Sequence, residues 1–264
     1  MNLINGDCLE ELKNIKEDSI DLIFCDLPYG QTSCKWDCKI DLNKFWIEVM
    51  RIKKLHTPIF FTTTVKFGTD LILSAPKKCF FRYDLVWVKS AVAGFLSAKK
   101  MPMRKHEMIY VFYEKLPFYN LSSHKHKFIK EDNNRKGKVY NSQGKESNDF
   151  KKKSIIKEEP KNIYSVEKEY PTDDRPSNVR TPAYEPPLPT SMLEIKSTRG
   201  KHRTEKPVAL MEWILKYYSK EGDTVLDPTM GSGSTGVACV NMNRKFIGIE
   251  KDKEIFKVAE ARLN

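Results

Sequence analysis

The feature that most constrains the fold is a strand, a glycine-rich turn, a helix and a second strand, all within residues 224–250. The turn occupies residues 227–234, directly after the apolar strand. Gly231 and Gly233 allow its backbone to turn tightly and to approach a ligand, because neither has a Cβ. This order of elements predicts an open α/β sheet that binds its ligand at the carboxyl ends of the strands.

The acidic residues of this segment indicate which ligand binds. Glu250 ends the second strand, 17 residues after Gly233, and a carboxylate at about this offset reaches the ribose hydroxyls of a nucleoside. The turn begins with Asp227-Pro228, where a carboxylate repels a pyrophosphate but attracts the ammonium and sulfonium of S-adenosylmethionine. The pattern therefore favours S-adenosylmethionine over NAD. A simpler interpretation stays open, in which Asp227 caps the turn and Glu250 is a solvated strand end.

A second turn follows another apolar strand, over residues 20–25. The Asp26 carboxylate and the Leu27 carbonyl are suited to accept both N–H bonds of a planar amine, and to offset the positive charge that develops when the amine is methylated. Pro28 lacks an N–H and stiffens the turn, and Tyr29 offers a face on which a base can stack. An ordinary proline turn after a strand is the alternative.

Residues 122–205 differ in composition from the rest of the chain. They contain 19 Lys or Arg and 13 Asp or Glu, and half of the chain's 14 prolines lie between Pro160 and Pro189. The formal net charge of the whole chain is +11, which favours a polyanionic partner. This segment is expected to be either a flexible surface insertion or a basic lobe that contacts nucleic acid.

Several other classes of protein are disfavoured. No apolar run approaches the ~20 residues of a membrane-spanning helix, and residues 1–7 lack the basic start and apolar core of a signal peptide. Of the six cysteines, only Cys34 and Cys38 are close in sequence, and no second pair completes a zinc site. We therefore expect free thiols, a cytoplasmic protein, no membrane partner and no bound metal.

Taken together, the two turns resemble the signature motifs of amino-DNA methyltransferases. Asp26-Leu27-Pro28-Tyr29 resembles the DPPY motif of these enzymes, and residues 227–235 resemble their cofactor motif, commonly written DPFxGSGTT. Residues 206–210 are similar to the helix that precedes the cofactor motif, and Gly248-Ile249-Glu250 is similar to the ribose-binding strand. The DPPY-like motif precedes the cofactor motif in the chain, as in the circularly permuted β group of this family.

The resemblance implies a Rossmann-like, seven-stranded methyltransferase sheet, circularly permuted and carrying a basic target-recognition insertion. Residues 1–115 would form the catalytic half, 116–205 the variable recognition region and 206–264 the cofactor-binding half. The catalytic residues implied are Asp26, Leu27, Pro28 and Tyr29. The implied contacts to S-adenosylmethionine are Asp7, Cys8, Lys206, Asp227, Pro228, Gly231, Ser232, Gly233 and Glu250.

Some of these assignments have competing interpretations. Asp7 is placed near the adenine of the cofactor by the resemblance, but it equally fits a plain helix N-cap. His106-Glu107 resembles a weaker family position near the target base. The family usually has proline at the position of Leu27, which the proposed chemistry uses only through its carbonyl, so we expect activity to survive this difference.

The resemblance implies methyl transfer to N6 of adenine in a specific duplex DNA sequence, with the base flipped out of the stack. It also suggests a homodimer and a cognate restriction endonuclease as partners. Methylation of cytosine N4 is the runner-up, although that group tends to have Ser in place of Asp26. Methylation of RNA or of a protein amide is a further alternative. A catalytically silent DNA-binding subunit is disfavoured because Asp26, Tyr29, Gly231 and Glu250 are all present.

Overall fold

The computed structural model describes residues 1–29, 40–126, 184–197 and 205–264. The chain divides into two compact units, one of Met1–Ser123 with Leu188–Asn264 and one of His124–Pro187. In the described part of the second unit, β6 (Lys125–His126) pairs antiparallel with β7 (Tyr184–Glu185). Most of the basic segment expected to recognise the target, together with Cys34 and Cys38, lies outside the described residues.

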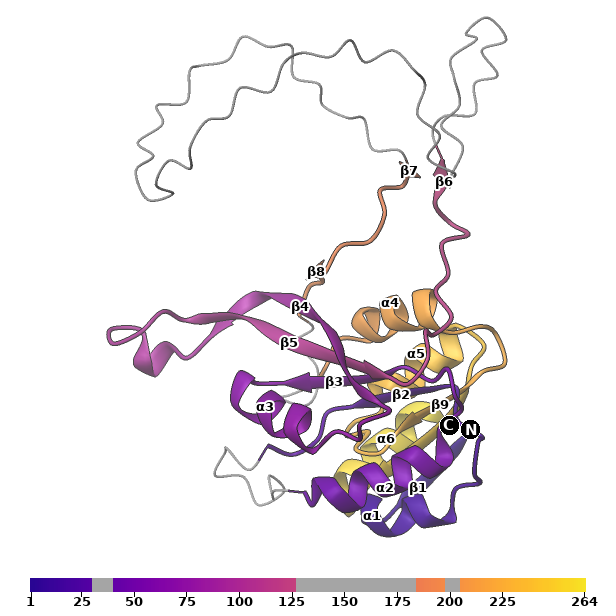
Figure 1. The fold of residues 1–264 in the computed structure, drawn as a ribbon. Coiled ribbons are helices and arrows are strands. Elements are labelled where there is room, and N and C mark those ends of the chain that lie inside the picture. Colours follow the sequence, from indigo (N-terminus) through magenta and orange to yellow (C-terminus); the bar gives the residue numbers. More distant parts are fainter. Residues whose placement is uncertain (30–39, 127–183, 198–204) are drawn as a thin grey trace, which may run out of the picture. The chain divides into compact units, whose positions relative to one another are not determined.

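An eight-stranded sheet forms the centre of the first unit, in the order β1-β10-β9-β2-β3-β5-β4-β8 (Figure 1). The strands are β1 (Asn2–Asn5), β2 (Leu22–Cys25), β3 (Ile59–Thr63), β4 (Phe80–Ala93), β5 (Arg104–Tyr113), β8 (Met192–Glu194), β9 (Thr224–Asp227) and β10 (Lys245–Glu250). Only β5 is antiparallel to its neighbours in this sheet. The expected Rossmann-like sheet is therefore present, and β8 extends its edge as an additional strand beside β4.

Helices cover both faces of this sheet, and two apolar clusters fill the space between the layers. One face carries α1 (Cys8–Glu11), the turn η1 (Leu12–Asn14), α2 (Leu42–Ile52) and α3 (Val65–Ser74). The other carries α4 (Val208–Tyr218), α5 (Ser234–Asn241) and α6 (Lys253–Leu263). Every residue of β2 and β3 is buried, as expected of parallel strands between two helical layers.

Side chains at helix starts decide where several helices begin. The sequence predicts a helix over residues 45–55, but α2 begins at Leu42 because the Asp41 carboxylate accepts hydrogen bonds from the next backbone amides. Asp252 caps α6 in the same way. Within the described ranges, none of the helices combines the length and the apolar character that crossing a membrane requires.

The hairpin of β4 and β5 is longer than the sequence predicts. Apolar runs in the sequence predict strands over residues 83–88 and 108–113, but the ladder continues to the pair Ala93–Arg104. The turn η2 (Phe95–Ser97) follows β4. We call residues 88–106 the arm, and Figure 1 shows it projecting beyond the other strands. Apolar alternation does not reveal this extension, because the arm's side chains are exposed on both faces of the hairpin.

The strand order brings four strand ends to one edge of the sheet. β2 lies between β9 and β3, and β10 lies beside β9, all running in the same direction. Asp26 follows β2, Asp227 ends β9 and Glu250 ends β10. Residues about 200 positions apart in the chain therefore meet at the carboxyl edge, where α/β sheets bind their ligands.

Candidate active site

Asp26 is the centre of a hydrogen-bond network at the end of β2. Its Oδ1 accepts hydrogen bonds from the Tyr29 hydroxyl, at 3.1 Å, and from Thr62 Oγ1. Its Oδ2 accepts one from Lys206 Nζ at 2.7 Å. A carboxylate has about four acceptor positions, so the second position on Oδ2 stays available to a ligand. Thr62 was not predicted from the sequence, although a run of three threonines at the end of β3 marks the place.

Lys206 ties Asp26 to the hairpin of β4 and β5. Its side chain is only 12% exposed, and its Nζ lies 2.7 Å from Asp26 Oδ2 and 3.2 Å from Glu107 Oε1. Glu107 also pairs with Lys89. Burial lowers the pKa of Lys206, but the Asp26 and Glu107 carboxylates more than offset this and raise the pKa above its ordinary value. Lys206 is therefore a fixed cation on the Asp26 carboxylate, and its expected contact with the cofactor stays a prediction.

Tyr29 is held at its hydroxyl and by one neighbouring ring. Its hydroxyl donates toward Asp26 and toward the Thr62 carbonyl, 2.9 Å away, and its ring lies 5.1 Å from that of Phe67 between centroids. Burial and the nearby Asp26 charge raise the pKa of Tyr29, so the hydroxyl stays protonated. The Leu27 side chain is buried in the core, which leaves its backbone as its contribution to the site, and Pro28 is half-buried beside it.

The glycine-rich turn is held by Glu250. Glu250 Oε2 accepts a hydrogen bond from the Gly231 amide at 3.0 Å, and Oε1 accepts one from the Asp252 amide at 2.8 Å. Burial raises the pKa of Glu250. Gly231 has a φ of +53°, and a Cβ built on it would meet no atom within 4 Å. The turn therefore presents backbone and a carboxylate to an open space, which suits the hydroxyls of a nucleoside.

Asp227 lies beneath this turn. Its carboxylate accepts hydrogen bonds from Thr235 Oγ1 at 2.6 Å and from the Thr229 amide at 3.1 Å. Burial raises the pKa of Asp227 to about 7. Pro228 and Ser232 are buried beside it. These contacts hold the shape of the turn, which is the simpler role considered for Asp227 from the sequence.

Gly233 closes the turn against α6. It has a φ of +83°, and a Cβ there would lie 2.9 Å from Leu263 Cδ1. The left-handed backbone therefore favours glycine at this position, and any larger residue would also have to displace the end of the Leu263 side chain.

Asp7 and Cys8 lie where β1 leads into α1, beside the end of β10. The Asp7 carboxylate caps α1 by accepting from the Leu9 amide at 2.9 Å, and it pairs with Lys251. The hydrogen bond from Lys251 lowers the pKa of Asp7. Burial raises the pKa of Cys8 to about 12. Asp7 is thus an N-cap by geometry, at the edge that also carries Glu250.

Cys25, next to Asp26 in the chain, is fully buried in the core. Burial and the nearby Asp227 charge raise its pKa well above the ordinary value. The thiol is therefore unsuited to act as a nucleophile, which requires the thiolate. Across the described ranges, no group of three or more His, Cys, Asp or Glu side chains is arranged to hold a metal ion.

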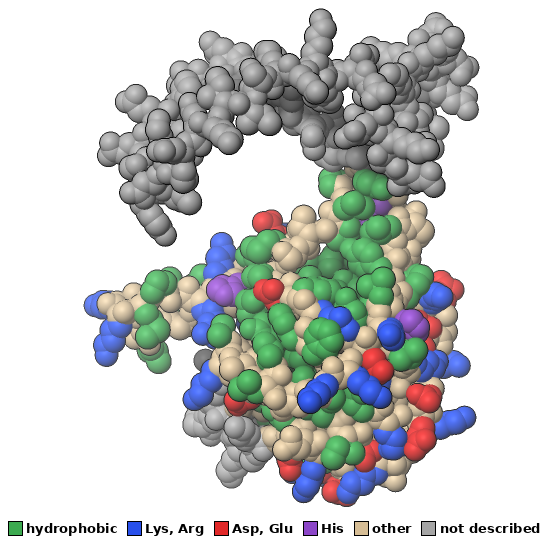
Figure 2. Space-filling view, viewed as in Figure 1, with side chains coloured by type: hydrophobic (Ala, Val, Ile, Leu, Met, Phe, Trp, Pro, Cys, Tyr) green, Lys and Arg blue, Asp and Glu red, His purple; other side chains and the backbone are tan. Residues whose placement is uncertain are grey.

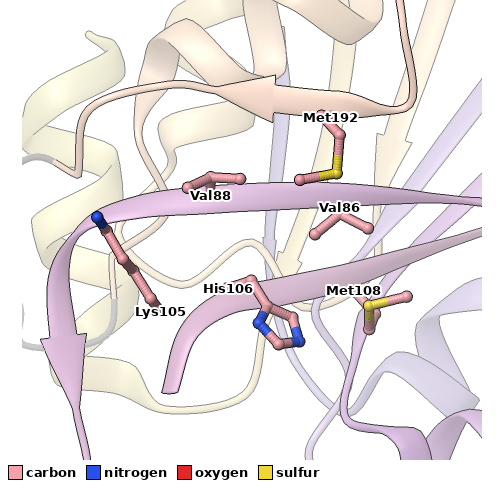
Figure 3. A pocket seen from close by; sticks show the side chains of 6 residues that line it. All are labelled: Val86, Val88, Lys105, His106, Met108 and Met192. Carbon is pink, nitrogen blue, oxygen red and sulfur yellow. The ribbon is translucent and has the colours of Figure 1, made fainter. Parts of the chain in front are cut away.

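A pocket of about 400 Å³ lies at the root of the arm (Figure 3). Its lining side chains are Val86, Val88, Lys105, His106, Met108 and Met192, from β4, β5 and β8. Figure 3 shows Lys105 and His106 beside the apolar side chains. His106 and Glu107, which the family resemblance placed near the target base, are neighbours in β5 but pair with successive residues of β4, so they point to opposite faces of the hairpin.

The sheet order and the two turns define a methyltransferase of the Rossmann-like type, and comparisons with known proteins agree. The DNA methylase family of the N6/N4 type matches residues 20–261, so the chain belongs to this family. The chain is 26% identical to the type II methyltransferase M2.LlaDCHI of Lactococcus lactis subsp. cremoris, with 99% of the chain and 88% of the relative covered. It is also 26% identical to the type II methyltransferase M.HpaI of Haemophilus parainfluenzae, with 99% and 74% covered.

Solved structures share the fold at lower sequence identity. The complex of M1.HpyAVI with SAM has a TM-score of 0.60 and 21% identity, with 99% of each chain covered. The cytosine-N4-specific PvuII DNA methyltransferase has a TM-score of 0.63 and 14% identity, with 99% of this chain and 86% of that chain covered. Fold and family together confirm the expected β-group DNA methyltransferase, with S-adenosylmethionine as its cofactor. The open space at Gly231 beside the Glu250 carboxylate fits this cofactor.

Proposed function

We propose that the protein transfers a methyl group to N6 of adenine within a specific sequence of duplex DNA, after the base has been flipped out of the helix. The observation that carries this proposal is the Asp26 carboxylate, whose Oδ1 takes two donors from the protein while Oδ2 takes only Lys206. One acceptor position on Oδ2 is thus kept for an N–H group of the target.

The residues of this chain divide the work as follows. Asp26 accepts one N–H of the amine and offsets the positive charge that develops on its nitrogen. The Leu27 carbonyl accepts the other, and the Tyr29 ring bears the base. Bound S-adenosylmethionine supplies an electrophilic methyl group. Glu250 and the turn at Gly231 would hold its ribose. They lie at the same edge of the sheet as the strand end that carries Asp26.

The Lys206 cation would by itself oppose a positive charge on the target amine, because both contact one carboxylate oxygen. Glu107 lies 3.2 Å from the same ammonium and offsets its charge. We assign to Lys206 and Glu107 the positioning of Asp26. Glu107→Gln is expected to lower kcat more than it raises KM, because the base is still bound. An unchanged kcat would contradict this assignment.

The product decides between adenine N6 and cytosine N4. Mass spectrometry of nucleosides from DNA methylated by the purified protein is expected to show N6-methyladenine. N4-methylcytosine would replace the proposal with its runner-up. 5-Methylcytosine formed by an enzyme that Cys25→Ser inactivates would overturn the mechanism, since the buried thiol takes no part in it.

The recognition role of residues 116–205 also belongs to this proposal, as do a homodimer, a cognate restriction endonuclease and a cytoplasmic location. Replacing residues 124–187, the second compact unit, by a short linker leaves β8 in the sheet. This change is expected to abolish sequence-specific methylation and to leave cofactor affinity largely intact. Methylation-aware sequencing of DNA from a host that expresses the protein would give the recognition sequence. The same sequence methylated by the shortened chain would refute the role of this region.

A further inference from the structure

The arm combines exposed apolar side chains with exposed cations. Phe95 is 82% exposed and Leu96 is 99% exposed, both at the turn that ends the arm. Val92, Met101 and Met103 are also exposed. Large apolar side chains gathered on a projecting segment mark a binding surface, since water disfavours them.

Charge identifies the kind of partner. Between Lys89 and His106 the sequence has five Lys or Arg and no Asp or Glu. Lys89 pairs with Glu107 at the root of the arm. Among the described residues, the other four form no ion pair; they are Lys99, Lys100, Arg104 and Lys105. Figure 2 shows hydrophobic and basic side chains together at the end of the arm.

The arm begins beside the proposed catalytic carboxylate. β5 is antiparallel to both β3 and β4, so β4 runs in the same direction as β3. β2 is parallel to β3. The carboxyl end of β4 therefore projects from the same edge of the sheet that carries Asp26. Glu107, where the arm joins the sheet, contacts Lys206, which contacts Asp26. From Val88 to Ala93 the strand rises about 16 Å, at roughly 3.3 Å per residue. The arm is therefore long enough to run beside several nucleotides of a DNA strand bound at the site.

We propose that the arm binds the target DNA next to the methylated base, with its cations on phosphates and the Phe95–Leu96 tip against bases. Aromatic faces stack on bases without sequence preference, and apolar wedges separate base steps in kinked duplexes. A second copy of the chain is a poorer occupant, because each copy carries a net charge of +11 and the arm has no carboxylate to receive the partner's cations. This contact is separate from the recognition role proposed for residues 116–205.

Two double variants test the inference, and DNA binding is measured by fluorescence anisotropy with a short labelled duplex of mixed sequence and with its single strand. Phe95→Ala/Leu96→Ala is expected to weaken binding about tenfold, the scale of one lost base stack. Lys99→Ala/Lys100→Ala is expected to make the slope of log K against log salt shallower by about 1.8 on duplex, as for two lost phosphate contacts. A loss confined to duplex identifies a wedge, and an equal loss on both probes identifies stacking on unpaired bases.

The matched controls lie away from the proposed contact. Lys16→Ala/Lys245→Ala removes two exposed cations at the amino edge of the sheet, and Ile47→Ala removes an exposed apolar side chain from α2. Both are expected to bind DNA as the unchanged protein does. Calorimetry with S-adenosylmethionine is expected to give the same affinity for all variants, which shows that each is folded.

Arm variants that bind DNA like the unchanged protein would overturn the proposal. So would arm variants that lose a dimer on gel filtration while DNA binding is intact, because the tip would then cover a second copy. The inference rests on DNA as the substrate and not on which base is methylated. Its failure is therefore distinct from a failure of the adenine proposal, which the nucleoside product decides.

Discussion

Asp26→Asn is expected to slow methyl transfer strongly while lowering the stability of the fold only moderately. The amide has nearly the shape of the carboxylate, but it offers only one oxygen and adds an N–H₂ donor. One oxygen cannot replace the two that now accept from Tyr29, Thr62 and Lys206. The three protein donors and the target amine must then share one oxygen and an NH₂ group, so the acceptor for the target is weakened. The negative charge that offsets the charge developing on that amine is lost outright.

The expected loss of methyl transfer is about 10²–10³-fold, as for removal of one preorganised polar partner from a reaction site. The cost in folding stability is smaller. Lys206 keeps Glu107 as a partner, so losing one charge-assisted hydrogen bond is expected to lower the free energy of unfolding by about 1–3 kcal/mol. In a chain of this length that corresponds to a fall in Tm of several degrees.

Single-turnover methylation with a radiolabelled methyl donor measures the first effect, and a thermal melt measures the second. Calorimetry is expected to show unchanged cofactor affinity, because the contacts assigned to the cofactor lie at Glu250 and Gly231. Asp18→Asn is a matched control: Asp18 is exposed and has a φ of +47°, which asparagine tolerates well. Methyl transfer by Asp26→Asn within tenfold of the unchanged rate, with cofactor bound, would refute the assigned role of this carboxylate.

Three further predictions follow from the site. Glu250→Ala should weaken S-adenosylmethionine binding by about 1–3 kcal/mol, because it also leaves the Gly231 amide without its acceptor; equal affinity by calorimetry would contradict the ribose assignment. Tyr29→Phe should keep most activity and Tyr29→Ala little, since the ring bears the base; equal rates for the two variants would argue against stacking. The pKa of Asp227 is raised from 3.8 to about 7, so its ionisation opposes folding, and the Tm of the unchanged protein should rise as pH falls from about 7 to about 4. Asp227→Asn should flatten that rise, and an unaltered pH dependence of Tm would count against the buried carboxyl as its source.

The parts of the fold that could be predicted are those with strong local patterns. The strand before Asp26 and the strand, turn and helix around Gly231 each carry continuous apolar residues and a turn signal, so their types and order were expected. β1, α3 and β8 were not predicted. β1 and β8 are short, with 4 and 3 residues, and their pairing depends on partners far away in the chain. Local residue patterns hold no information about such partners.

In the site, too, residues within local motifs could be predicted and contacts between distant residues could not. Turn positions such as Asp26 and Glu250 could be identified because glycine, proline and acidic residues stand at fixed offsets. The contact between Lys206 and Asp26 could not be predicted, because it joins residues 180 positions apart. The family resemblance placed Lys206 at the cofactor, which stays a prediction. Thr62 was not predicted for a related reason. A threonine at the end of a buried strand does not by itself indicate a site, and its role depends on Asp26, which follows the neighbouring strand.

The pairing of β2 with β9 has a consequence for how this protein is made. These two strands lie side by side at the centre of the sheet, with Ile23 opposite Leu226, so the chain between them must form a very long loop before the pair can close. Closing such a loop costs entropy and slows folding. During synthesis, an emerging chain lacks β9 and β10 until residues 224–250 have left the ribosome. A chain interrupted before that point has the DPPY-like turn but no glycine-rich turn to face it, and we expect it to be degraded rather than to compete for DNA.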